Sequence, residues 1–148
     1  MELKQIAPYL PYGLKIIVDI YGQKSEIGIL YGANNKQLEL LEIRETITES
    51  FNYEFCKPIL RSLSDLTKEI EHNGERFVPI EWLRKEYTGF YFESNPELMI
   101  KSKNTNLYIS INWTNKFQEK LLEWKFDVFN LIGTFAIDAN NLETNPYK

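Results

Sequence analysis

The stretch at residues 57–87 constrains the fold most, because it carries the clearest signals for where elements begin and end. Ser64 stands where a helix N-cap would, and the pair Asn73 and Gly74 supplies a left-handed stop. These signals predict one short helix over residues 64–72.

The next start signal in the chain predicts a second helix. Pro79 occupies a favourable first helical position, and Ile80 and Leu83 share one face behind it. The pattern predicts a short helix over residues 79–87.

The N-terminal half has the composition of strands. Residues 14–21 and 26–31 are rich in β-branched and aromatic side chains, and residues 22–25 form a plausible turn between them. We expect a hairpin here, preceded at residues 3–10 by a short helix or a structured lead-in that prolines keep short.

Residues 37–50 fit two interpretations. A helix would align Leu40, Ile43 and Ile47 on one face, whereas the β-branched run at residues 46–48 favours strands. We prefer strands, because short segments separated by turns surround this one. The choice between helix and strand stays open at this point.

The remaining elements alternate between strand and helix. Residues 51–60 resemble an edge strand, because Pro58 is tolerated only at an edge or an end. Residues 107–111 alternate as a strand does, and residues 116–132 carry the wide apolar stripe of a long, largely buried helix. A polar tail at residues 143–148 is expected to fray.

Together these elements predict an α+β fold in one domain, residues 1–148. A small, mostly antiparallel N-terminal β-sheet would pack against short helices and one long C-terminal helix. Hydrophobic residues make up 43% of the 148, enough for a core without disulfides or metals.

Charge and hydropathy exclude several classes of protein. The formal net charge of −4 disfavours direct binding to nucleic acid and suits approach to a basic protein surface. No apolar window approaches the length of a membrane span, and the single cysteine, Cys56, fits a reducing cytoplasm. We expect a cytoplasmic protein that binds no membrane.

A search for catalytic, metal and cofactor sites identifies none. His72 is the only histidine and lies in a sequence that ends a helix, while Cys56 lies in an apolar strand. These two residues cannot supply four zinc ligands, and the glycines form no phosphate-binding motif. We therefore expect no enzyme and no bound cofactor.

Two groups of residues are candidates for binding a partner. Glu39, Glu42, Glu45 and Glu49 form an acidic run, which reads first as a solvated face. The aromatic residues beyond residue 80 exceed what a minimal core needs, and the alternative to a core role is an exposed anchor for a partner. The aromatic candidates are Trp82, Tyr87 and Tyr91.

Three blocks of the chain resemble a family of small, uncharacterised proteins encoded by bacteriophages and prophages. The blocks are YLPYGLK at residues 9–15, KPILRSLSDLTKEIEHNGERFVPIEWL at residues 57–83, and LLEWKFDVFNLI at residues 121–132 followed by AID. The family usually has proline where this chain has Ser62, and residues 88–113 match nothing in it.

The resemblance implies phage origin and no particular reaction. A small acidic phage protein without an active site is most simply a binder of a host protein, and we expect an inhibitor of host defence that resembles the anti-CRISPR class. It would dock on an RNA-guided nuclease in the bacterial cytoplasm, with the glutamates competing with guide-RNA phosphates and the aromatics anchoring the interface.

Two other classes remain open. A structural or regulatory phage protein would bind a phage-encoded partner and leave host immunity unaffected. A small enzyme using carboxylates would require Asp and Glu side chains to converge in a pocket with raised pKa values.

Overall fold

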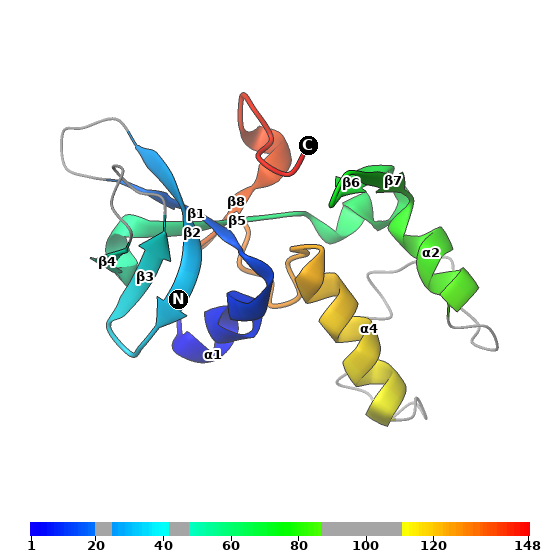
Figure 1. The fold of residues 1–148 in the computed structure, drawn as a ribbon, viewed down its shortest axis with the longest axis horizontal. Helices are drawn as coiled ribbons and strands as arrows, with labels where there is room; N and C mark the ends of the chain where they lie inside the picture. The colour runs from blue at the N-terminus through cyan, green and yellow to red at the C-terminus, as the bar shows by residue number, and fades with distance from the viewer. Residues whose placement is uncertain (20–24, 42–47, 87–110) are drawn as a thin grey trace.

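The computed structural model contains both helices and strands, arranged around a mixed sheet of six strands (Figure 1). It describes residues 1–19, 25–41, 48–86 and 111–148, with side chains in the last range from Asn115 onward. The helices are α1 (Leu3–Ile6), α2 (Pro79–Glu86) and α4 (Ile111–Glu123), and the 3₁₀ turns are η1 (Ala7–Tyr12), η2 (Tyr53–Phe55), η3 (Leu63–Thr67) and η5 (Ala139–Asn141).

The large sheet has the strand order β4-β3-β2-β1-β5-β8, and only the pair β5 and β8 is parallel. Its strands are β1 (Lys15–Val18), β2 (Glu26–Ala33), β3 (Gln37–Leu41), β4 (Glu49–Asn52), β5 (Cys56–Leu60) and β8 (Ile137–Asp138). The expected N-terminal hairpin is confirmed as β1 and β2, and the strand interpretation of residues 37–50 is confirmed at both ends. Residues 42–47 lie outside the described part of the chain.

One face of this sheet is buried. Its side chains alternate along each strand with outward-facing ones, as the pleat requires. The inward residues include Ile16, Val18, Leu30, Leu38 and Leu40. Helix α1 and η1 cover them with Ile6 and Tyr9, so the short N-terminal helix expected at residues 3–10 is confirmed as part of the core.

Strand β5 is not an edge strand, and this expectation was wrong. It lies between β1 and β8, which is the true edge. Pro58 is accommodated because β8 pairs only with Ile59 and Leu60, so Pro58 faces a hydrogen-bonding neighbour on the β1 side alone.

The helix expected over residues 64–72 is also wrong. The chain there forms η3 and then a small two-stranded sheet of β6 (Ile70–His72) and β7 (Glu75–Phe77). Asn73 and Gly74, with φ of 52° and 80°, turn this hairpin instead of ending a helix. An Asn-Gly pair can either end a helix or turn a hairpin. The antiparallel pairing of β6 with β7 shows that it turns a hairpin here.

The second expected helix is confirmed as α2. The expected bounds of the long helix, residues 116–132, are wrong, because α4 spans Ile111–Glu123. Helix α4 ends at Glu123, because Lys125 adopts a left-handed φ of 63°. The amide of Phe126 donates to the carbonyl of Leu121 and that of Lys125 to the carbonyl of Leu122, which is the Schellman arrangement. Residues 107–110 of the expected strand lie outside the described residues.

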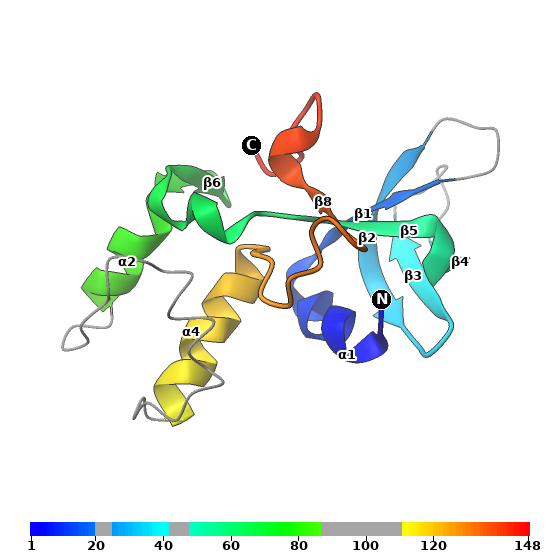
Figure 2. The same ribbon diagram turned by 180° about the vertical axis from the view of Figure 1, so that it is seen from behind.

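A second hydrophobic cluster joins α2, α4 and η3. It contains Leu66, Ile70, Leu83, Phe117, Leu121, Trp124 and Phe126. Figures 1 and 2 both place α2 and α4 together at the end of the molecule opposite β3 and β4. The two clusters meet at Phe126, whose carbonyl accepts a hydrogen bond of 2.6 Å from the Tyr9 hydroxyl.

The C-terminal tail is anchored, which corrects the expectation that it frays. The Tyr147 hydroxyl donates to the carbonyl of Ile59 at 2.8 Å and accepts from the amide of Lys15 at 3.1 Å. The Tyr147 carbonyl accepts from the Arg61 guanidinium at 3.0 Å. The tail thus ties β1 to β5 and, through the Arg61 guanidinium that also donates to the Glu71 carbonyl, reaches β6.

Candidate interaction surface

The strand register separates the two described glutamates of the acidic run. Glu39 pairs with Ser50, and Leu40 pairs with Glu49. Paired residues share a face, and Leu40 points into the core, so Glu49 lies on the inward side and Glu39 on the outward side. Glu42 and Glu45 lie outside the described residues.

Glu39 lies close against the backbone of β2. A β-bulge at Tyr31 makes Tyr31 and Gly32 together oppose Glu39. A side chain added at Gly32 would meet the Glu39 carboxylate, because a Cβ atom there would lie 3.0 Å from Cδ of Glu39. The missing side chain of Gly32 therefore lets Glu39 fold over β2 beside Tyr31.

Trp82 packs against the helical cluster instead of standing free as an anchor. Its ring meets Trp124 edge to face at 5.2 Å, and the Lys120 ammonium lies 5.3 Å from the ring centre. The half-buried ring lines a shallow hollow of about 260 Å³ between β6, β7 and α4. Tyr87 and Tyr91 lie outside the described residues.

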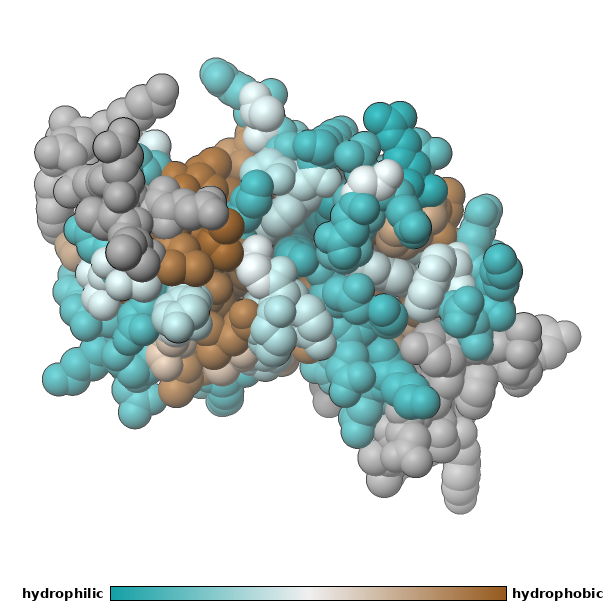
Figure 3. Space-filling view, viewed as in Figure 1, coloured by the Kyte–Doolittle hydropathy of each residue, from teal (hydrophilic) through white to brown (hydrophobic). Residues whose placement is uncertain are grey.

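The outward face of β1, β2 and β3 is apolar and open. Ile27 and Tyr31 on β2 are 44% and 62% exposed, and Ile17, Ile29 and Leu41 beside them are half-buried. Figure 3 shows hydrophobic residues at the surface over β1 and β2. We call these five residues, with Glu39 at their border, the open sheet face.

The open sheet face was not among the expected sites, although the sequence carried a signal for it. Residues 14–21 and 26–31 are apolar at most positions, whereas a half-buried strand alternates apolar and polar residues. Two neighbouring strands that are apolar on both faces indicate a second apolar surface, which is either covered or available to a partner.

The two candidate nucleophilic and basic side chains do not form a catalytic pair in the structure. Burial raises the pKa of the Cys56 thiol to about 12, so the thiol stays protonated in the core at neutral pH. Burial lowers the pKa of His72, which lies on β6 with Nε2 3.6 Å from the Glu123 carboxylate. Among the residues that the structure describes, no three His, Cys, Asp or Glu side chains gather to hold a metal ion.

Comparison with protein families, with curated proteins and with solved structures finds no match to this chain. In the described ranges, no helix is both long and apolar enough to span a lipid bilayer. The site must therefore be interpreted from its own chemistry.

Proposed function

We propose that this chain is a phage-encoded protein that binds and inhibits a component of a host defence system, resembling the anti-CRISPR class and docking on an RNA-guided nuclease in the bacterial cytoplasm. The observation that carries the binding role is the open sheet face, with Ile27 and Tyr31 exposed. Contiguous apolar surface of this kind marks interaction sites on soluble proteins. The identity of the partner rests on the resemblance to phage proteins.

Charge favours a basic partner surface. The chain has a net charge of −4, and Glu39 lies beside Tyr31 at the border of the apolar face. Tyr31 would enter an apolar pocket of the partner, while Glu39 would pair with Lys or Arg side chains that otherwise hold the phosphates of the guide RNA. This arrangement interferes with guide RNA without binding nucleic acid itself.

The test is a pull-down with the tagged chain from a bacterial lysate that contains CRISPR systems, read by mass spectrometry with and without ribonuclease and at two salt concentrations. Wild type should recover an RNA-guided nuclease. The double variant Ile27→Ser/Tyr31→Ser should recover at least about tenfold less, as expected when an interface anchor is lost.

Two matched controls distinguish the loss of a contact on the open sheet face from a general loss of stability or of negative charge. Phe135→Ser removes another exposed apolar side chain, 49% exposed, just before β8 at the opposite edge of the sheet. Glu39→Lys and Glu49→Lys make the same charge change on opposite faces, and only Glu39→Lys should weaken capture. Recovery of phage proteins alone would favour the structural or regulatory role, and equal effects of both lysine variants would contradict the assigned face.

A further inference from the structure

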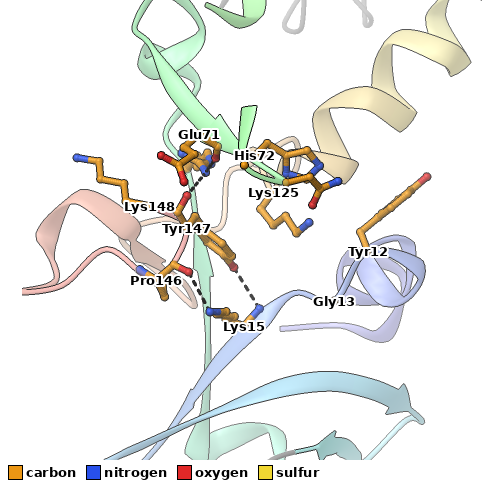
Figure 4. A pocket seen from close by; sticks show the side chains of 12 residues that line it. Tyr12, Gly13, Lys15, Glu71, His72, Lys125, Pro146, Tyr147 and Lys148 are labelled. Atoms are coloured by element: carbon orange, nitrogen blue, oxygen red, sulfur yellow. Dashed lines mark hydrogen bonds between the residues drawn. The ribbon is translucent and has the colours of Figure 1, made fainter. Parts of the chain in front are cut away.

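A second feature, independent of the open sheet face, is a positively charged hollow of about 340 Å³ (Figure 4). It lies where η1, β5, β6, the end of α4 and the C-terminal tail meet. Its cationic lining consists of Lys15, Arg61, Lys125 and Lys148. The single acidic side chain in the lining, Glu71, pairs with Arg76 at 3.1 Å.

Arg61 is buried and forms no ion pair with any residue that the structure describes. It is 4% exposed, and its guanidinium donates to the backbone carbonyls of Glu71 at 2.8 Å and Tyr147 at 3.0 Å. Its Nε is buried with no hydrogen-bond partner in the described part of the chain. Buried donors are nearly always satisfied, so an unmet one in the lining of a pocket calls for an explanation.

Lys125 carries three separate costs at the same position. It is 8% exposed, its φ of 63° is unfavourable for any residue with a side chain, and among the described residues its ammonium donates to the Glu123 carbonyl alone, at 2.6 Å. Burial lowers its pKa to about 8. Strained, buried and charged residues of this kind concentrate at ligand sites.

Lys15 completes the pattern, because its ammonium donates to the Pro146 carbonyl at 2.9 Å. No ion pair formed by the described residues includes Lys15, Arg61 or Lys125. Buried cations normally have anionic partners, since carbonyl dipoles compensate a full charge only in part. The nearest described carboxylates, Glu123 for Lys125 and Asp65 for Arg61, act on these cations without forming ion pairs with them, so the hollow has room and charge for an added anion.

We propose that this hollow binds a phosphate-bearing small molecule, held by Arg61 and Lys125 with Lys15 and Lys148 at its border. Phosphate suits the site because it carries up to two charges and offers several oxygens to donors arriving from different elements. The volume lies at the lower end of the range for small-molecule sites and exceeds what a bare phosphate fills.

The aromatic wall indicates an organic group on that phosphate. Tyr12, Lys125 and Tyr147 all line the hollow, and the view in Figure 4 shows the two tyrosine rings on either side of the Lys125 ammonium. Tyr147 is held by hydrogen bonds to β1 and β5, whereas Tyr12 is half-buried at the end of η1. A planar base stacked on Tyr12 would leave its phosphates facing Lys125 and Arg61, so nucleotides are the first class to test.

The experiment is calorimetric titration of the full chain with ADP, adenosine, pyrophosphate and inorganic phosphate, together with thermal melting in each. ADP should bind and raise the melting temperature, and adenosine should do neither. Tighter binding of ADP than of pyrophosphate and phosphate identifies an organic phosphate as the ligand. Equal affinities for ADP, pyrophosphate and phosphate would show that the hollow recognises the phosphate group alone. Either of these two results supports an anion site in the hollow.

Lys125→Met is the decisive variant, because removing a buried charge that forms no ion pair with a described residue should leave the fold at least as stable as before. We expect affinity to fall at least about tenfold, the loss of one charge-assisted contact. Lys36→Met is the matched control, since it removes the same charge from the exposed turn between β2 and β3. No binding of any probe at millimolar concentration, or equal weakening by both variants, would overturn the proposal; neither result bears on the open sheet face.

Discussion

In the sheet region, strands β1 to β4 follow one another in the chain, and each pairs with its neighbour in sequence. The second cluster, built from α2, α4, η3 and β6, draws instead on residues 63–83 and 117–128, which a long stretch of chain separates. The sheet region thus depends on local alternation and turns, and the helical region on contacts between distant segments.

The two regions also differ in what determines where their strands and helices end. Strands β1 and β2 end within a few residues of where their apolar runs end. Helix α4 stops at Glu123 although its apolar stripe continues, because the backbone of Arg61 pairs on both sides of Phe126. Here a partner more than 60 positions away overrode a favourable local pattern.

The largest expected effect concerns the side chain buried where the two regions meet. Phe126 is fully buried in the helical cluster, and its carbonyl accepts the Tyr9 hydroxyl from the sheet side. Phe126→Ala should lower the free energy of unfolding by about 3–5 kcal/mol, measured by urea denaturation. Phe135→Ala, at a half-exposed position, should cost less than about 0.5 kcal/mol. A wild type that unfolds in two separate steps would show that the regions are independent.

The next effect concerns Lys125, at the junction. Its pKa is lowered from 10.5 to about 8, first by burial and then by Arg61 and Lys15, with Glu123 opposing. Between about pH 8 and pH 10.5 the unfolded state binds more protons than the folded state, so Lys125 makes the free energy of unfolding rise with pH. Below about pH 8 Lys125 is charged in both states, and its full destabilising effect is present.

Lys125→Met should therefore stabilise the protein by about 1–3 kcal/mol at pH 7, with the advantage shrinking as the pH rises above 8. Urea denaturation of wild type and Lys125→Met at several pH values measures the difference between their free energies of unfolding. Cys56 and the tyrosines titrate in both proteins, so their contributions cancel in this difference. A difference that stays constant with pH would contradict the cause assigned to the pKa shift.

The smallest effect tests the hairpin within the helical region. Gly74 has φ of 80° and nothing within 4 Å of the position of a Cβ atom, so Gly74→Ala should cost only the backbone term, about 1 kcal/mol. Glu75→Ala beside it is the control and should change stability by less than about 0.5 kcal/mol. Cross-strand NMR contacts between Glu71 and Arg76 should be present in wild type; a helical pattern there would contradict the pairing of β6 with β7.

Much of the candidate binding surface was beyond prediction from the sequence. The acidic run was visible, but which face Glu39 and Glu49 occupy depends on the register of β3 with β4. A shift of one residue exchanges the faces, and nothing in the run itself sets that register. The open sheet face was visible only as an excess of apolar residues in β1 and β2.

The positively charged hollow left no sequence signal at all. Its four cations come from positions 15, 61, 125 and 148, which no motif spacing links. They meet because Tyr147 anchors the tail to β1 and β5, and because the chain reverses at Lys125. Such a site exists only in the folded chain.

The sequence by itself determined the α+β class, the N-terminal hairpin, helix α2 and the absence of a recognisable catalytic motif, because each depends on local periodicity, turn residues or composition. Only the tertiary structure decided that Asn73 and Gly74 turn a hairpin, that α4 stops at Glu123, and that four cations share one hollow. Local preferences there are worth about 1 kcal/mol, and burial of a large side chain such as Phe126 is worth several times more.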